Sequence, residues 1–114
     1  MDDCVFCRIL KGELPASKVY EDDRVLAFDD VRPVAPVHVV AIPKKHIPTL
    51  MDIKTGEEDY LNALLAAVPE IARRKGIDQK GFRVVINCNT EGGQVVFHLH
   101  LHVLGGKTLG AQLV

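Results

Sequence analysis

Apolar residues follow two different periods along this chain, and the change between them separates strands from helices. Short runs rich in valine, alanine and isoleucine lie at 18–20, 25–29 and 37–42 with turns between them, which is the pattern of three consecutive strands. Two further runs, at 82–88 and 95–104, flank a glycine-containing loop and predict an antiparallel hairpin. We therefore expect five strands, of which the first three form an antiparallel meander.

One long segment has helical periodicity. Between Glu57 and Lys75 the apolar residues recur every three or four positions, which places them on one face of a helix. These residues are Tyr60, Leu61, Leu64, Leu65, Val68, Ile71 and Ala72. A shorter apolar stretch at 6–10 predicts one or two further helical turns. The expected fold class is α+β, a five-stranded antiparallel sheet with one long and one short helix.

Local signals mark the ends of the long helix. Thr55 and Glu58 have the spacing of a capping box, and Gly76 suits the left-handed position that follows a last helical turn. Pro69 lies inside the helical pattern and has no amide hydrogen for the carbonyl four residues earlier. We expect a kink at Pro69, or a helix that restarts there.

Length and charge limit the function classes. With 114 residues and 12.6 kDa the chain has room for one domain, residues 1–114, around one core. It contains no apolar run of about 20 residues, the length that crosses a bilayer. The net charge of -1 provides no general attraction for nucleic acid, so any phosphate must be held locally. Neither a membrane nor a nucleic acid is an expected partner.

The cysteines and the amino terminus predict a compartment. There are three cysteines, an odd number, and the first residues, MDDCVFC, are acidic and lack the basic and apolar regions of a secretion signal. A disulfide framework and secretion are therefore not expected. The sequence predicts a cytoplasmic protein.

The most informative segment reads His-Leu-His-Leu-His at 98–102. Because side chains alternate along a strand, His98, His100 and His102 are expected on one face. The outer pair would be about 13 Å apart, too far to share one zinc ion with ligand distances of about 2 Å. Imidazoles in a row suit attack on a phosphoryl group and donation to its oxygens. The alternative is a set of exposed or hydrogen-bonded core histidines.

This run resembles the histidine triad motif, in which histidines alternate with apolar residues, and the similarity extends along nearly the whole chain. Matching segments in the same order are Phe28-Asp29-Asp30, Ala35-Pro36-Val37-His38, Ile42-Pro43-Lys44-Lys45-His46-Ile47 and Gly92-Gly93-Gln94. The trailing Leu104-Gly105-Gly106 is similar to the nucleotide-binding, phosphoramidase-like branch of the family.

The resemblance implies a hydrolase of purine nucleoside 5′-phosphoramidates or related nucleoside monophosphate esters. His100 would attack the α-phosphorus and form a nucleotidyl-histidine intermediate, which water then hydrolyses. His102 would contact a phosphate oxygen or protonate the leaving group, and His38 would support the cluster. A backbone carbonyl accepting from Nδ1–H of His100 would aim Nε2 at phosphorus. A homodimer with a continuous ten-stranded sheet is also implied.

The same resemblance assigns the substrate-binding residues. Asp30 would accept hydrogen bonds from the ribose hydroxyls, and Asn87 would lie near the phosphate. Backbone amides after the double glycine would approach the phosphate oxygens; they belong to Gly93, Gln94 and Val95. The base pocket would be walled by Leu14, Phe28 and Val31, although these residues could equally be plain core.

Cys4 and Cys7 form a CxxC pair with three alternative roles. No βαβ unit follows the pair to indicate a thioredoxin-like redox site. Some bacterial histidine triad proteins bind a structural zinc through such a pair, and by this resemblance the remaining ligands would be His46 and His98. Cysteines without metal are the third alternative. Catalysis itself is expected to need no cofactor.

Two departures from the family pattern leave the leaving group open. Val95 stands where the nucleotide-binding branch often has Ser, which removes a hydroxyl donor, and the tail at 107–114 lacks the Trp of many relatives. One alternative is hydrolysis of dinucleoside polyphosphates, which the doubled glycine after the triad disfavours. Another is a nucleotide-binding interaction module whose catalysis is vestigial.

Overall fold

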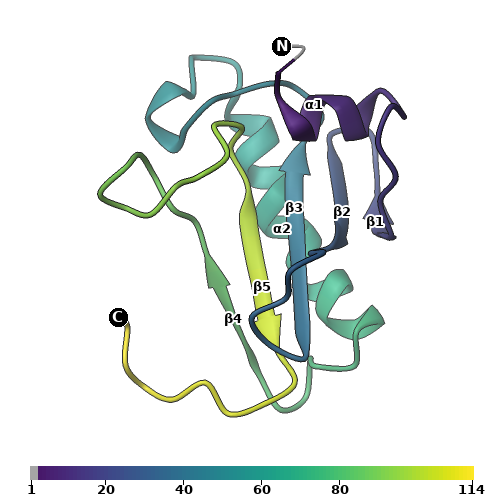
Figure 1. The fold of residues 1–114 in the computed structure, drawn as a ribbon, viewed down its shortest axis with the longest axis vertical. Coiled ribbons are helices and arrows are strands. Elements are labelled where there is room, and N and C mark those ends of the chain that lie inside the picture. The colour runs from purple at the N-terminus through teal and green to yellow at the C-terminus, as the bar shows by residue number, and fades with distance from the viewer. Residues whose placement is uncertain (1–2) are drawn as a thin grey trace.

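A computed structural model describes residues 3–114 and shows a sheet with one long helix packed against it (Figure 1). Both helices and all five strands predicted from the sequence are present. In chain order the elements are α1 (Val5–Leu10), β1 (Lys18–Glu21), β2 (Val25–Asp29), β3 (Val37–Pro43), the 3-10 helix η1 (Leu50–Asp52), α2 (Glu58–Arg74), β4 (Phe82–Val85) and β5 (Leu101–Gly105). The sequence pattern had not indicated η1.

The sheet has the strand order β1-β2-β3-β5-β4, and every neighbouring pair is antiparallel. The predicted meander is therefore confirmed for the first three strands, and the predicted hairpin partners are neighbours as well. β5 lies between β3 and β4, so the histidine segment enters the middle of the sheet (Figure 1). β4 forms one edge.

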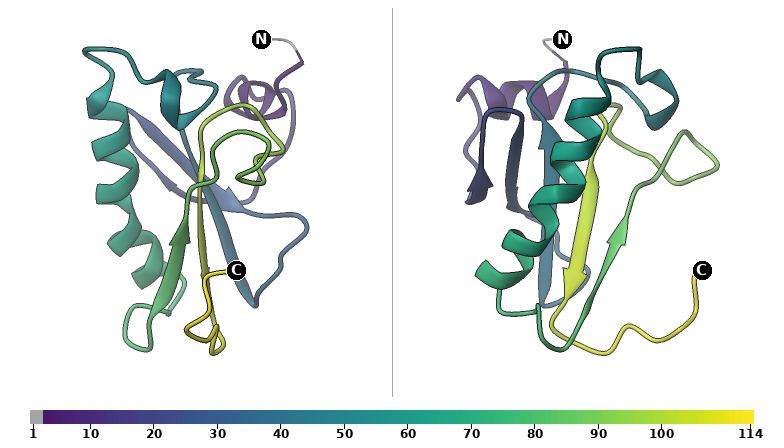
Figure 2. Two further views of the ribbon diagram at one scale, coloured as in Figure 1. Left: turned by 90° about the vertical axis from the view of Figure 1, so that its left-hand side faces the viewer. Right: turned by 180° about the vertical axis from the view of Figure 1, so that it is seen from behind.

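The main core lies between the sheet and α2, which covers one face (Figure 2). Alternate residues of the strands point to this helix, as their period of two requires. The helix contributes Leu64, Ala67, Val68, Ile71 and Ala72 to this core. Leu65, expected on the buried face, is half exposed. No helix of the described residues is long and apolar enough to span a membrane.

The start of α2 differs from the predicted capping box. The helix is capped at Glu57, and the Glu58 carboxylate accepts from the amide of Gly56, not from that of Thr55. The positive φ of Gly56, 92°, makes a turn just before the helix and moves its start beyond Thr55. Gly76 does adopt the left-handed conformation expected at the other end. The helix continues without interruption through Pro69, so the expectation of a restart there is wrong.

The last two strands are shorter than predicted, which matters because the histidines lie at the start of one of them. β4 ends at Val85 and β5 begins only at Leu101, so His98 and His100 precede the strand. The register that pairs Ala41 with Leu101 would place Leu99 opposite Pro43. Pro43 has no amide hydrogen, and the ladder ends there. The Leu99 amide donates instead to the carbonyl of Ile47, at 2.6 Å.

A second, smaller apolar cluster lies on the face of the sheet opposite α2. It contains Phe6 of α1 with Leu26, Phe28, Val40 and Ile42 of the sheet. Figure 2 shows α1 and the long loops on this side, away from α2. The polar side chains of the histidine segment belong to this second face, so the predicted site lies there.

Candidate active site and metal centre

The alternation of the histidine segment survives its departure from the strand. Leu99 and Leu101 are fully buried in the core under α2, whereas the ring of Phe6, on the other face, packs edge-on against His98 and His100. The three histidines therefore share one side, as predicted. Phe6 was not among the predicted site residues, and its place between Cys4 and Cys7 was the available signal.

The four predicted metal ligands come together. Their ligand atoms lie within 4.8 Å of one another, although the residues come from α1, the segment after β3 and the segment before β5. Nδ1 of His98 lies 3.4 Å from Sγ of Cys4 and 3.5 Å from Sγ of Cys7. Nδ1 of His46 lies 3.2 Å from both Sγ of Cys7 and Nδ1 of His98.

These separations can be compared with a tetrahedral zinc ion. Bond lengths of about 2.3 Å to sulfur and 2.05 Å to nitrogen require ligand atoms about 3.3 Å apart for two nitrogens and about 3.6 Å for sulfur and nitrogen. The nitrogens of His46 and His98 are 3.2 Å apart, and sulfur–nitrogen distances are 3.2 to 3.5 Å. The donor set of two cysteines and two histidines therefore fits zinc.

Hydrogen bonding prepares His98 for this role. Its Nε2 lies 3.0 Å from the carbonyl oxygen of Pro43, which can only accept, so Nε2 carries the hydrogen and Nδ1 presents a lone pair to the cysteines. Burial lowers the pKa of His98 to about 4 and keeps the ring neutral. Without a metal ion, burial and the neighbouring Cys4 raise the pKa of Cys7 to about 11. A bound metal would reverse this, because it deprotonates a coordinating thiol.

His100 has the orientation that the proposed nucleophile requires. Its Nδ1 lies 2.7 Å from the main-chain oxygen of His98, which accepts the Nδ1 hydrogen and leaves a lone pair on Nε2. Among the described residues, every buried side-chain nitrogen or oxygen has a hydrogen-bond partner. Nε2 of His100 has none, so solvent reaches it although the residue is only 7% exposed. Burial also lowers the pKa of His100, which favours the neutral, nucleophilic ring.

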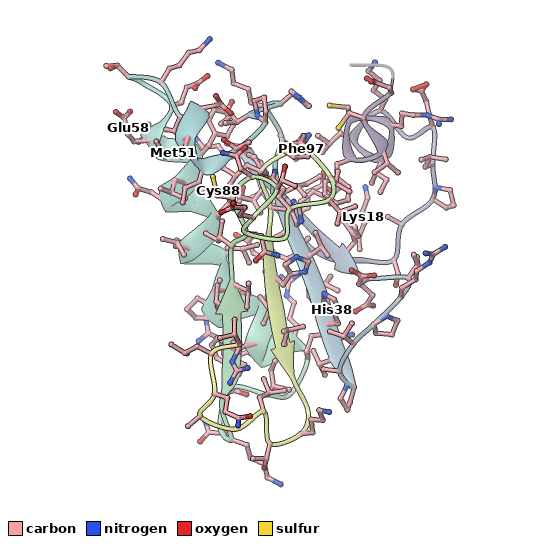
Figure 3. All side chains as sticks on the ribbon, turned by 60° about the vertical axis from the view of Figure 1, so that its left-hand side comes forward. Lys18, His38, Met51, Glu58, Cys88 and Phe97 are labelled. Atoms are coloured by element: carbon pink, nitrogen blue, oxygen red, sulfur yellow. The ribbon has the colours of Figure 1, made fainter. Side chains whose placement is uncertain are left out.

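Beside His100, three groups form a chain. Nε2 of His38 lies 2.9 Å from Nδ1 of His102 and 3.4 Å from Oδ2 of Asp30. The main-chain amide of Val34 donates to Nδ1 of His38, at 3.1 Å, so the His38 hydrogen must be on Nε2. That hydrogen is donated to Nδ1 of His102, which places the His102 hydrogen on Nε2. His38 belongs to β3, as Figure 3 shows.

The ligand atoms of Asp30, His38 and His102 are also close enough to hold a metal ion. The amide of Val34 argues against this use of them. It already occupies the Nδ1 lone pair of His38, so a metal on Nε2 would require the fully deprotonated imidazolate. The cluster is therefore suited to holding and passing a proton. Burial, with smaller contributions from His100 and His38, lowers the pKa of His102 to about 4.

The loop before the histidines is organised by hydrogen bonds of its own. The amide of Gly93 donates to the Thr90 carbonyl, and that of Gln94 donates to the Asn89 carbonyl. The Gln94 side chain accepts from the Asn89 amide and donates to the carbonyls of Pro48 and Val96. Of the three amides expected near phosphate, two are therefore engaged within the loop, and the Gln94 side chain ties the loop to the segment after β3. The phosphate role of these amides stays a prediction.

The remaining predicted substrate residues are spread along the open face. Val31 and Val95 are 91% and 86% exposed, so neither is covered by other parts of the described chain. Phe28 is buried in the second apolar cluster, where its ring meets that of Phe6. Leu14 is half-buried after α1, and Asn87 is half-buried in the loop after β4. Cys88 and Phe97 mark that loop in Figure 3.

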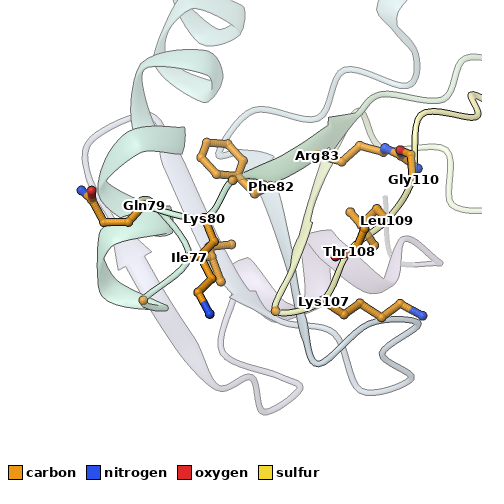
Figure 4. A pocket seen from close by; sticks show the side chains of 12 residues that line it. Ile77, Gln79, Lys80, Phe82, Arg83, Lys107, Thr108, Leu109 and Gly110 are labelled. Atoms are coloured by element: carbon orange, nitrogen blue, oxygen red, sulfur yellow. The ribbon is translucent and has the colours of Figure 1, made fainter.

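A large cavity lies away from the histidines, beyond the opposite end of β5. It has a volume of about 740 Å³ and is lined by the turn between α2 and β4 and by residues 106–110 (Figure 4). Arg83 crosses it to donate to the carbonyl of Gly110, at 2.6 Å. None of the predicted site residues lines this cavity.

Comparison with known proteins shows the family of this chain. The family model of the HIT domain matches residues 11–109, and the chain belongs to that family. It is 40% identical to the purine nucleoside phosphoramidase of Escherichia coli K12 over 98% of this chain and 94% of that protein. A histidine triad protein from Clostridium difficile is 52% identical over 98% and 97% of the two chains, with a TM-score of 0.93. A HIT family hydrolase from Clostridium thermocellum is 44% identical over 100% and 99%, with a TM-score of 0.97.

Proposed function

We propose that this HIT-family protein hydrolyses purine nucleoside 5′-phosphoramidates through a covalent nucleotidyl-histidine intermediate. The observation that supports this most directly is the bond from Nδ1 of His100 to the His98 carbonyl, 2.7 Å long, which leaves a solvent-reached lone pair on Nε2. The E. coli relative named as a purine nucleoside phosphoramidase supports the substrate class.

The reaction has two displacements at phosphorus. First, Nε2 of His100 forms a bond to the α-phosphorus, and the bond between phosphorus and the leaving nitrogen breaks. The departing amine keeps the electron pair of that bond and takes the proton from Nε2 of His102, and the negative charge left on the His102 ring is balanced by the positive charge of the nucleotidylated His100 ring. Water then attacks phosphorus and returns a proton to His102. The electron pair of the N–P bond goes back to His100, and the nucleoside monophosphate is released.

The surroundings of the histidines favour this chemistry without a metal at phosphorus. His100 and His102 are held neutral by burial, so one ring offers a lone pair and the other an N–H group at neutral pH. The carboxylate of Asp30 is partly exposed beside them, where ribose hydroxyls can donate to it. Val95 supplies no hydroxyl. Its main-chain amide donates to no other group of the described residues, so it is available to a phosphate oxygen.

Turnover of adenosine 5′-phosphoramidate tests the proposal. We expect His100→Ala to lose at least about a thousandfold in kcat, because it removes the nucleophile. Cys88→Ser is the matched control, since Cys88 lies outside both clusters, and it should retain wild-type activity. Mass spectrometry of protein quenched during turnover should show a nucleotidyl adduct on His100. Equal rates for wild type and His100→Ala would refute the mechanism.

Two other outcomes would redirect the assignment. Faster turnover of a diadenosine polyphosphate than of the phosphoramidate, on one preparation, would favour a dinucleoside polyphosphate hydrolase. Tight binding of adenosine monophosphate with negligible hydrolysis of every substrate would favour a nucleotide-binding interaction module. The exposed Val95 in place of a hydroxyl donor is the feature that makes both comparisons worthwhile.

We also propose that Cys4, Cys7, His46 and His98 hold a structural zinc ion. The ion would tie α1 to the segments that flank β3 and β5, and so fix the His98 carbonyl that orients His100. It takes no part in the displacement at phosphorus. Metal analysis of protein purified without chelators should find one zinc per chain. Zinc content near zero, with no uptake on reconstitution, would contradict this.

A homodimer is the third part of the proposal. β4 is an edge strand whose Phe82 and Val84 are both 37% exposed, and Leu65 of α2 is also half exposed. Pairing of two β4 strands across a two-fold axis would satisfy their free edges and extend the sheet to ten strands. Light scattering should give twice the chain mass at micromolar concentration, and Val84→Lys should shift the protein toward monomer. A wild-type monomer at that concentration would contradict it.

A further inference from the structure

We propose that the ribose hydroxyls of the substrate select the reactive tautomer of His102, acting through Asp30 and His38. This inference rests on the proposed function, since it assumes a nucleotide whose sugar meets Asp30. Its starting point is one nitrogen with two neighbouring acceptors. Nε2 of His38 is hydrogen-bonded to Nδ1 of His102 at 2.9 Å, and Oδ2 of Asp30 lies 3.4 Å from the same nitrogen without a hydrogen bond.

His38 cannot avoid this choice by changing its own tautomer. Its Nδ1 accepts the main-chain amide of Val34, and moving the hydrogen to Nδ1 would break that bond and place two N–H groups face to face. His38 is also buried, with only 7% of its surface exposed, so water offers little replacement. The hydrogen therefore stays on Nε2. It can be donated either to His102 or to Asp30, but not fully to both.

The two acceptors are opposed in strength and distance. His102 is nearer but neutral, whereas Asp30 is farther but charged, and charged acceptors form the stronger hydrogen bonds. When the His38 ring turns so that its hydrogen points to Asp30, Nδ1 of His102 has no donor and no N–H group opposite, and it can carry the ring hydrogen itself. Nε2 then presents a lone pair to the phosphate and cannot supply a proton. When His38 donates to His102, the hydrogen stays on Nε2, where the leaving group needs it.

A bound ribose would decide which of the two acceptors receives the His38 hydrogen. Oδ1 of Asp30 already accepts from the Arg32 amide at 2.7 Å, and the side chain is 24% exposed. Ribose hydroxyls that donate to the remaining lone pairs would weaken the carboxylate as an acceptor for His38. The His38 hydrogen would then go to His102. Asp30 and His38 are positioning residues in this scheme, and His102 is the group that meets the substrate.

Among residues 3–114, the titratable groups with an electrostatic effect on His102 leave this arrangement undisturbed. The groups around it are His100, His38 and Asp30. The only hydrogen of neutral His100 is held by the His98 carbonyl, so it cannot be passed to His102. The tautomer of His102 therefore depends on His38 alone, and through it on what binds Asp30.

Kinetics with modified sugars test the inference. We expect 2′,3′-dideoxyadenosine 5′-phosphoramidate to raise KM and also to lower the wild-type kcat about tenfold, which is a part of the roughly 10²–10⁴-fold that proton transfer by a positioned side chain contributes. In His38→Ala both substrates should be slow with equal kcat, and only the KM difference should remain. His38→Gln, whose amide can accept from Val34 and donate to His102, should recover part of the lost kcat. A wild-type difference confined to KM, or the same kcat ratio in His38→Ala, would overturn the proposal.

Imidazole 15N spectra of the wild-type protein provide a test that needs neither turnover nor a variant. Saturation with adenosine should move His102 to a single form with the hydrogen on Nε2, and saturation with 2′,3′-dideoxyadenosine should not. Identical His102 signals with both nucleosides would overturn the inference. If no phosphoramidate is hydrolysed, the proposed function fails, and the two nucleosides still decide whether the sugar controls His102.

Discussion

Two clusters that each contain a pair of histidines lie side by side on one face of the sheet, yet they suit different tasks. In the cluster of Cys4, Cys7, His46 and His98, all four ligand atoms lie within 4.8 Å of one another, and the nitrogens of the two histidines are 3.2 Å apart. In the cluster of Asp30, His38 and His102, donors and acceptors alternate in a line. The first arrangement suits a cation and the second suits a proton.

The difference originates in main-chain groups that no side-chain pattern reveals. The Pro43 carbonyl takes the Nε2 hydrogen of His98 and turns its lone pair toward the sulfur atoms. The Val34 amide fills the Nδ1 lone pair of His38 and sends its hydrogen outward. The Pro43 carbonyl therefore prepares His98 to act as a metal ligand, whereas the Val34 amide makes His38 a hydrogen-bond donor.

The largest effect should come from breaking the first cluster. Cys7→Ser should abolish zinc binding and lower the free energy of unfolding by several kcal/mol, because structural metal binding contributes directly to folding. Cys88→Ser is the control, and both can be compared by metal analysis and urea unfolding. If Cys7→Ser keeps the stability of the zinc-loaded wild type, this cluster is not a structural metal centre.

Removing one main-chain amide should have a smaller effect on the second cluster. Val34→Pro deletes the donor to His38 at a residue whose side chain is 70% exposed, so little packing is lost. His38 could then hold its hydrogen on Nδ1, and we expect kcat to fall about tenfold. Val34→Ala keeps the amide and serves as the comparison. Equal kcat for the two variants would show that the amide does not set the tautomer.

The stability of the protein should depend on pH through His102. Its pKa is lowered from an ordinary value of 6.5 to about 4, so the folded state binds this proton less readily than the unfolded chain. No penalty arises above pH 6.5, and stability is lost as the pH falls from there toward 4. Urea midpoints across this range should fall less steeply for His102→Gln. Parallel curves for the two proteins would rule out His102 as the source.

The smallest expected effect concerns metal binding in Asp30→Asn, which should not differ from that of the wild type. Titration of metal-free protein with Co²⁺ should give one equivalent with the intense bands of thiolate coordination. Asp30→Asn should give the same stoichiometry and spectrum, because the second cluster does not compete for the ion. A second equivalent that disappears in Asp30→Asn would remove the distinction between the two clusters.

The sequence by itself determined the fold class, the strand order of the meander and the face shared by the histidines. These follow from local periodicity, since residues two apart on an extended chain face the same way. The ends of the elements were less accessible. The early end of the ladder at Pro43 depends on which residue lies opposite Leu99, and that register exists only in the assembled sheet.

Only the tertiary structure decided what each histidine does. His98, His100 and His102 are equivalent in the pattern, but one meets the Pro43 carbonyl, the next meets the carbonyl of His98, and the last meets His38. An imidazole has two interchangeable nitrogens, and its hydrogen goes to the one whose neighbour accepts it. Those neighbours are main-chain and side-chain groups brought together by folding, so the sequence could place the rings but not their hydrogens.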